Sequence, residues 1–501
     1  MIKKLGLFAL LTPLLFTAQS YASKVSTLAE STATYAVNTY KKDMINSLAQ
    51  LVKHNTVVVE GIPSPENPVH IAFKEELKKQ ATALGLEFKD DGYVVIIALG
   101  DSKERLGIIT HGDVQPANPS KWNQSPYTLD LTSKPGNIIG RGTEDDKGPI
   151  STALYAMKAI KDKNIKLNKR LELYIYMAEE SDWGPLEEYI KTHDVPQTNI
   201  TIDAEYPAVT AEKGYGTISL TFPTKIITTQ QTYMKSFTGG FFGSQIPEDA
   251  TAVIENTDIQ LLQTLINKSK AYKNINFDLT LKDRTLTINA LGKSAHSSTP
   301  EDGVNAVTYL ADLLSFKQWP SNTSGSLVNF INDNIGTGLY GKKFGNIAFS
   351  DDFMGPLTVS PTVLKQLDDG MQLNINIRRP RGKKTNLLKK EIIQAVNQWE
   401  NNNNNSITNL SITVKEPWVQ TDAPHLDTLL SIFSHYTGVK NAKPISIGGG
   451  TNSRMFPRAV SFGPSMPNTE YSGHTEREFI TMKQFMLNLK MYTAAFIELA
   501  K

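Results

Sequence analysis

The most informative stretch of this sequence, residues 140–149, reads Gly-Arg-Gly-Thr-Glu-Asp-Asp-Lys-Gly-Pro. Three consecutive acids lie between glycine-containing turns, and apolar residues at helical spacing begin directly afterwards at Ile150. Glycine allows tight turns, and carboxylates are favoured ahead of a helix N-terminus. Taken alone, the acids are equally consistent with a helix cap on a surface loop. What favours a functional reading is the surrounding sequence, which has a His-x-Asp upstream and a Glu-Glu pair, an Asp and a late His downstream.

Length and composition describe a soluble protein with more than one domain. The chain has 501 residues, which exceeds one ordinary hydrophobic core. Its apolar fraction of 40% and charged fraction of 20% are typical of globular proteins. A net charge of +2 argues against nucleic acid or another polyanion as partner. Because cysteine is absent, disulfides, thiolate metal ligands and a thiol nucleophile are excluded.

The N-terminus has the pattern of a secretory signal. Lys3 and Lys4 precede a mostly apolar run over residues 5–16, and Ser20-Tyr21-Ala22 offers small residues at the cleavage positions. This pattern predicts a signal peptide over residues 1–22, cleaved near Ala22. The alternative, an uncleaved membrane anchor, is opposed by the shortness of the apolar run. We therefore expect a secreted or periplasmic protein whose mature form is not in a membrane.

The two ends of the chain predict an α/β domain with a mostly parallel sheet flanked by helices. Helices are expected at 37–53, 69–86, 150–161, 185–193, 426–436 and 482–499, and strands at 93–99, 106–110, 171–177, 199–202 and 444–447. Several of these strands are continuous apolar runs, as in a sheet covered on both faces. We assign residues 23–212 and 415–501 to this domain, which would carry the chemistry.

The middle of the chain has a different pattern and predicts an inserted α+β domain. Alternating strands are expected at 216–222, 277–281, 286–291 and 410–414, and helices at 259–271, 304–316 and 386–399. The asparagine run over 401–405 predicts a loop tip. We assign residues 213–414 to this insert.

Five residues are candidate metal ligands: His111, Asp145, Glu180, Asp203 and His474. Three of them follow predicted strands, whose carboxyl ends line one crevice in an α/β sheet. Imidazole and carboxylate suit zinc, manganese or cobalt. Each residue alone is also explained as an ordinary surface or core residue, so spacing leaves both interpretations open.

The motifs together resemble the ArgE/DapE/PepV group of co-catalytic zinc metallopeptidases, peptidase family M20, and are most similar to its PepV-type dipeptidases. The matching pieces, in the family's order, are His111-Gly112-Asp113, Gly140-Arg141-Gly142 with Asp145-Asp146-Lys147-Gly148-Pro149, Glu179-Glu180, Asp203-Ala204-Glu205-Tyr206-Pro207, Gly292 to His296, Gly448-Gly449-Gly450-Thr451 with Arg454, and Gly473-His474. They span nearly the whole chain after the signal.

The resemblance implies a site for two divalent metal ions. Zinc is the usual metal of the family, and manganese or cobalt are the alternatives. His111 and Asp203 would bind one ion, and Glu180 and His474 the other. Asp145 would bridge both ions and would be followed by a cis peptide bond.

The resemblance also implies catalytic residues. Asp113 would orient the imidazole of His111, and Glu179 would be the general base toward the attacking water.

Substrate-binding residues are implied as well, mostly in the insert, which would act as a lid. His296 would stabilise the oxyanion, and Arg378 would bind the free carboxylate of a dipeptide. Thr451 and Arg454 are assigned to substrate binding by the same resemblance. The sequence departs from the family at two places. Arg379 stands where the family usually has an aromatic residue, so Arg379 could bind the substrate carboxylate in place of Arg378. Ser244 stands where these dipeptidases tend to have Asn.

The function expected from these residues is an exported metal-dependent dipeptidase acting on small peptides. An N-acyl-amino-acid deacylase on the same scaffold is the first alternative, and a non-catalytic peptide-binding protein is the second. Because the insert is long enough to close over the site without a partner subunit, we expect a monomer.

Overall fold

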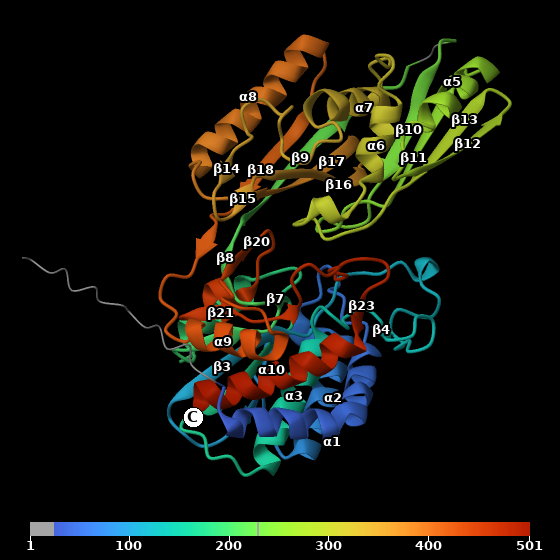
Figure 1. Ribbon diagram of the computed structural model, residues 1–501. Helices are drawn as coiled ribbons and strands as arrows, with labels where there is room; N and C mark the ends of the chain where they lie inside the picture. Colours follow the sequence, from blue (N-terminus) through green and yellow to red (C-terminus); the bar gives the residue numbers. More distant parts are fainter. Residues whose placement is uncertain (1–24, 228–229) are drawn as a thin grey trace, which may run out of the picture.

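The computed structural model describes residues 25–227 and 230–501 of the chain. The predicted signal peptide, residues 1–22, lies outside the described residues. In Figure 1 the N-terminal and C-terminal parts of the chain form a lower body of sheet and helices, and the middle of the chain forms an upper body.

The lower body is built on one mixed sheet. Its strands run in the order β1-β2-β5-β3-β6-β21-β8-β19, and β20 also pairs with β8. Their bounds are β1 Glu87–Asp90, β2 Val94–Leu99, β3 Arg105–His111, β5 Arg170–Tyr176, β6 Asn199–Thr201, β8 Val209–Glu212, β19 Trp418–Val419, β20 Ile445–Ile447 and β21 Ala459–Ser461. The central strands β5, β3, β6 and β21 pair in parallel, and the outer neighbours of this group pair antiparallel. The predicted α/β class is confirmed, and the sheet is mixed: its parallel pairs are the central ones and β20 with β8, and its other pairs are antiparallel.

Helices cover both faces of this sheet. Helices α1 (Thr27–Val52), α2 (Pro68–Leu84), α3 (Lys147–Asp162), α9 (Leu426–Thr437) and α10 (Met482–Ala500) share one core with Val95 and Ile97 of β2. Helix α4 (Gly184–Thr192) packs on the other face with Val94. Neighbouring residues of β2 thus enter opposite cores, which is why a buried strand reads as a continuous apolar run. Within the described part of the chain, no helix has the length and apolar character needed to cross a membrane.

Helix α1 begins ten residues earlier than predicted. Its extra turns bury Ala29, Ala33 and Ala36, whose small side chains give little hydrophobic signal in the sequence. Ser26 caps the helix, since its hydroxyl accepts a hydrogen bond from the Ala29 N–H at 3.2 Å.

The upper body has two four-stranded sheets. One runs β16-β17-β9-β18 and the other β10-β11-β13-β12. Their strands are β9 Gly214–Pro223, β10 Tyr233–Gly239, β11 Asp249–Glu255, β12 Asn276–Lys282, β13 Thr285–Leu291, β16 Thr358–Gln366, β17 Gly370–Arg379 and β18 Thr408–Val414. Helices α5 (Ile259–Ser269), α6 (Ala306–Leu313), α7 (Thr323–Asn334) and α8 (Thr385–Asn403) accompany them. The sequence patterns missed α7 and the strands β10, β11, β16 and β17.

The asparagine run was interpreted wrongly as a loop over its whole length. Helix α8 continues to Asn403, and the chain turns only at Asn404, which has a left-handed φ of 46°. Asparagine tolerates this conformation and therefore ends the helix at that residue.

The chain passes between the two bodies at two places. Strand β8 belongs to the lower sheet and β9 to an upper sheet, with Lys213 between them. The chain returns from the upper body to the lower body between β18, which belongs to an upper sheet, and β19, which belongs to the lower sheet. The division into residues 23–212 with 415–501 and residues 213–414 stays a prediction, and these changes of sheet support it.

The stretch that opened the sequence analysis connects β4 (Asn137–Ile139) to α3. Gly142 adopts a φ of +87°, and Gly148 lies so close to the loop that an added Cβ would come within 2.0 Å of the Thr143 carbonyl oxygen. Both glycines are therefore required by the path of the loop.

We predict that Gly148→Ala destabilises the protein, by at least about 2 kcal/mol, because the backbone of Thr143 must shift to make room. Thermal unfolding measures the effect. Gly338→Ala is the matched control, since no atom lies within 4 Å of the Cβ it adds. Equal melting temperatures for the two variants would contradict the prediction.

Candidate active site

Parallel neighbouring strands bring the predicted ligands to one edge of the lower sheet. Strand β3 ends at His111, Glu179 and Glu180 follow β5, and Asp203 follows β6. Asp145 comes from the loop before α3, and His474 from the loop before α10. Two groups have ligand atoms within 4.8 Å of one another: His111 with Asp145 and Asp203, and Asp145 with Glu180 and His474.

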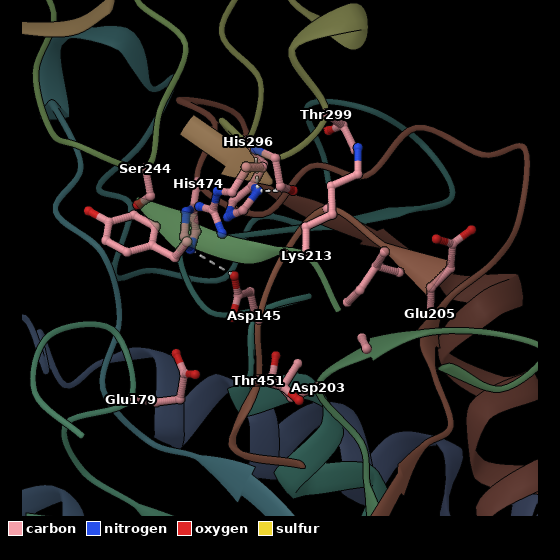
Figure 2. A pocket seen from close by; sticks show the side chains of 18 of the residues that line it. Asp145, Glu179, Asp203, Glu205, Lys213, Ser244, His296, Thr299, Thr451 and His474 are labelled. Carbon is pink, nitrogen blue, oxygen red and sulfur yellow. Dashed lines mark hydrogen bonds and ion pairs between the residues drawn. The ribbon is translucent and has the colours of Figure 1, made fainter. Parts of the chain in front are cut away.

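Asp145 is the member shared by both groups. Its Oδ1 lies 2.9 Å from Nε2 of His111, and its Oδ2 lies 3.1 Å from Nε2 of His474. Each imidazole also faces a second acid, Asp203 at 3.7 Å from His111 and Glu180 at 2.8 Å from His474. Figure 2 shows Asp145 at the centre of the cavity, below His474 and above Asp203. The two oxygens of one carboxylate therefore point at two different ligand sets.

The expected contact between Asp113 and His111 is made mainly by the backbone. Nδ1 of His111 lies 3.0 Å from the Asp113 carbonyl oxygen and 3.5 Å from its carboxylate. The Asp113 carboxylate instead accepts hydrogen bonds from the N–H groups of Glu179 and Glu180, each at 3.0 Å. Asp113 thus positions both a histidine and the acidic pair.

The loop that carries Asp145 is held by Glu478, a residue the sequence analysis did not single out. Oε1 of Glu478 accepts from the N–H of Glu144 at 2.9 Å and of Asp145 at 3.0 Å. Oε2 accepts from the N–H of Gly142 at 3.0 Å and from Arg141 at 2.9 Å. The Glu478 carboxylate is fully buried, as is the Arg141 guanidinium.

The peptide bond between Asp145 and Asp146 is cis, as the resemblance implied.

Glu144 ties this loop to the loop of His474. Its carboxylate accepts hydrogen bonds from Ser465 at 2.9 Å and from both the N–H and the hydroxyl of Ser472 at 2.7 Å. Glu144 and Glu478 therefore each connect the loop of Asp145 to the segment that carries His474, and together they set the position of His474 relative to Asp145.

Tyr471 makes a further contact that the sequence analysis missed. Its hydroxyl donates to Oδ2 of Asp145 at 2.8 Å. The ring lies against Gly473, where an added Cβ would come within 2.2 Å of the Tyr471 oxygen. Glycine before His474 is thus needed for this contact.

The donor set fits divalent metal ions. Burial lowers the pKa of His474, but the carboxylates of Glu180 and Asp145 outweigh it and raise the pKa to about 10. The pKa of His111 is likewise raised well above its ordinary value by Asp203, Asp113 and Asp145, against the effect of burial. Histidine must lose this proton to bind a metal, and a cation between the carboxylates would take its place. Oxygen and nitrogen ligands suit zinc, manganese and cobalt alike.

The paired groups open onto a cavity of about 1620 Å³ between the two bodies. Glu179 lines it, and its Oε1 has no hydrogen-bond partner among the described residues. Burial raises the pKa of Glu179 well above its ordinary value, and the nearby Asp203 acts in the same direction. One oxygen of this carboxylate is therefore without a competing hydrogen bond from the described residues, on the wall of the cavity that also holds the paired groups.

The upper body contributes His296, Arg378 and Ser244 to the cavity wall. The ring centroid of His296 lies 4.5 Å from that of His474. Arg378 is buried and donates to Asn376 and Ser297 at 3.0 and 3.2 Å.

The choice between Arg378 and Arg379 follows from the alternation along β17. Arg379 does not line the cavity; it donates to Thr385 at 2.6 Å and pairs with Glu416 at 3.0 Å. Arg378 is thus the arginine of this strand that can meet a substrate.

Thr451 and Arg454 also line the cavity, and both are anchored by Glu212. Oε1 of Glu212 accepts from the Thr451 N–H at 3.1 Å and hydroxyl at 2.7 Å, and Oε2 lies 3.0 Å from Nε of Arg454. The neutralised Arg454 guanidinium lies over the Trp183 ring at 5.9 Å.

The residues that sequence reasoning missed make side-chain contacts with segments distant in the chain. Glu478 and Tyr471 lie within a few residues of His474, and Glu144 precedes Asp145, so proximity to a motif was the available signal. Glu212 had no such signal.

Comparisons with known proteins identify the family of the chain. Residues 107–498 match the model described as peptidase family M20/M25/M40. The Bacillus subtilis protein YtjP, which carries a provisional dipeptidase name, is 30% identical over 480 residues, covering 92% of this chain and 98% of its own. Beta-Ala-Xaa dipeptidase of Lactobacillus delbrueckii subsp. lactis is 30% identical over 413 residues, covering 82% of this chain and 85% of its own.

Two solved structures share the fold. Human carnosine dipeptidase 1 matches with a TM-score of 0.57 and 15% identity, covering 95% of this chain and 99% of its own. The dipeptidase Dug1p of Saccharomyces cerevisiae matches with a TM-score of 0.55 and 14% identity, covering 93% and 98%.

We predict that Glu478→Gln weakens metal binding about 10- to 100-fold, because a neutral amide cannot accept from the three loop N–H groups and the guanidinium as a carboxylate does. Isothermal titration with zinc measures the affinity. The matched control is Glu476→Gln, another buried glutamate of the same segment, which accepts from Asn118 and Trp122 instead. Unchanged affinity in Glu478→Gln would refute the role given to Glu478.

Proposed function

The chain belongs to peptidase family M20, and from this premise we propose that it is an exported two-metal dipeptidase with Glu179 as general base. Membership of the family makes it a hydrolase of the metallopeptidase type. The observation that carries the finer proposal is the Asp145 carboxylate, which faces His111 on one side and His474 on the other, beside Glu179.

In this proposal His111 and Asp203 would hold one ion and Glu180 and His474 the other, and Asp145 would contribute a carboxylate to both. Two bound divalent ions would supply Lewis acidity for the carbonyl and acidify water at neutral pH. Zinc is the first choice of metal, with manganese or cobalt as alternatives.

The chain's own residues supply the proton transfers. Glu179 takes the proton of the attacking water and delivers it to the leaving amine nitrogen. Its Oε1 has no competing hydrogen bond among the described residues, which supports this role. Asp113 keeps Glu179 in place through the N–H at 3.0 Å. His296, from the lid, donates to the developing oxyanion.

The substrate proposed is a short peptide with free termini. The buried Arg378 fork suits the C-terminal carboxylate, and Thr451 and Arg454 line the same cavity. Dipeptidase names among relatives that match 82–92% of this chain support a dipeptide over an N-acyl amino acid.

Export, domain roles and assembly complete the proposal. The pattern over residues 1–22 supports secretion or a periplasmic location after cleavage near Ala22. Residues 213–414 would form the lid, and a single chain supplies both walls of the cavity, which supports a monomer.

We predict that the protein hydrolyses dipeptides, that chelation abolishes the activity and that zinc or manganese restores it. Glu179→Gln lowers kcat about 100-fold or more because proton transfer is lost, while metal binding remains. Steady-state assays and metal analysis measure both. Glu188→Gln, an exposed glutamate on α4, is the control. Activity that persists after chelation and in the Glu179→Gln variant would contradict the two-metal mechanism.

We further predict faster cleavage of Ala-Ala than of N-acetyl-Ala-Ala or N-acetylalanine. A free amino terminus distinguishes a dipeptidase from a deacylase, and comparison of kcat/KM for the three compounds separates them. Preference for N-acetylalanine would establish the deacylase instead. Metal binding without any hydrolysis would favour the peptide-binding protein.

A further inference from the structure

The lid wall of the cavity carries two buried cations, Arg378 and Lys213, that form no ion pair within the described part of the chain. Arg378 is 5% exposed and Lys213 is 7% exposed, and both line the cavity. Neither forms an ion pair with any residue in 25–227 or 230–501, whereas Arg454 is neutralised by Glu212 at 3.0 Å. Lys213 appears in none of the roles assigned above.

Neutral groups alone hold the two cations in place. Nζ of Lys213 donates to the Pro356 carbonyl oxygen at 2.6 Å, which uses one of its three donors. Arg378 donates to Asn376 and Ser297, and its guanidinium lies over the Tyr215 ring at 5.0 Å. Figure 2 shows the Lys213 side chain within the cavity, between His296 and Glu205.

Both cations line the same wall of the cavity. Arg378 of β17 is directly opposite Tyr215 of β9, and Lys213 immediately precedes the first residue of β9, Gly214. All three side chains line the cavity. Arg379, one residue on, points away and pairs with Glu416.

A buried charge without a partner costs free energy, so its presence needs a reason. Burial lowers the pKa of Lys213, Arg378 acts in the same direction, and Glu301 opposes them. Glu301 is exposed and lies beyond ion-pair distance of the ammonium. Two neighbouring cations that are held by neutral groups are organised to receive an anion.

We propose that Lys213 binds a second carboxylate of the substrate, so that the enzyme prefers dipeptides whose C-terminal residue is Asp or Glu. Arg378 takes the α-carboxylate, and Lys213 takes the side-chain carboxylate of the same residue. These two groups are joined by a short carbon chain, which suits two neighbouring cations on one wall of the cavity. The inference rests on the proposed dipeptidase function and names its substrate class.

The test compares Ala-Glu with Ala-Gln, which has nearly the same shape without the second charge. In the wild-type holoenzyme at low ionic strength, kcat/KM for Ala-Glu is about tenfold or more above that for Ala-Gln, mostly through KM. In Lys213→Met the ratio falls to about 1. Because both substrates are measured on one preparation, a partly unfolded fraction cancels. Lys365→Met, an exposed lysine of β16, keeps the wild-type ratio.

Two outcomes would overturn the inference. One is equal kcat/KM for the two dipeptides in the wild type, and the other is an unchanged ratio in Lys213→Met, including the case in which both substrates lose activity equally. A preference for tripeptides over Ala-Glu that Lys213→Met abolishes would also overturn it, since Lys213 would then bind the carboxyl end of a longer chain.

Failure of the proposed function gives a different result, which is no hydrolysis of either dipeptide. The inference is then tested by calorimetric binding of the same two dipeptides to the holoenzyme. Tighter binding of Ala-Glu by about tenfold, lost in Lys213→Met, supports it, and equal affinities overturn it.

Discussion

The rest of the site depends on the hydrogen bonds that the Glu478 carboxylate accepts from the loop of Asp145 and from Arg141. It is fully buried, and both of its oxygens are used by the loop that leads to Asp145 and by Arg141. A buried carboxylate is tolerated only where such hydrogen bonds and an opposite charge compensate for lost water. The strand β23 (Phe479–Thr481), which directly follows Glu478, pairs with β4, which directly precedes the loop, so the pairing holds the carboxylate next to the start of the loop. The position of Asp145 is therefore fixed by a residue more than 300 positions away in the chain, Glu478.

The two walls of the cavity have opposite electrostatic character. The wall of the lower body gathers three carboxylates around two histidines, which organises it for cations. The wall of the upper body presents Arg378 and Lys213 without counterions among the described residues, which organises it for anions. A substrate that carries carboxylate at one end and a scissile carbonyl at the other satisfies both walls. In the proposed mechanism the metal ligands lie on the lower body, and the two cations proposed to bind carboxylate lie on the opposite wall of the cavity.

Local patterns predicted the catalytic part of the fold well because its strands are buried on both faces. Continuous apolar runs located β2, β3 and β5, and the rule that ligands gather at the carboxyl ends of parallel strands placed His111 with Asp203. The identity of the site came from combined motifs, since no single residue type was decisive. The register of β17 could not be read from the sequence, so the choice between Arg378 and Arg379 needed the structure. Glu478 and Tyr471 could not be found because their contacts cross between loops.

The central claim, that one carboxylate bridges two metal ions, is tested most directly by a crystal structure of the zinc-loaded protein with anomalous scattering at the zinc edge. The account predicts two peaks roughly 3.5–4 Å apart. Asp145 should lie between them, with His111 at one peak and His474 at the other. A single peak, or two peaks that Asp145 does not bridge, would contradict it.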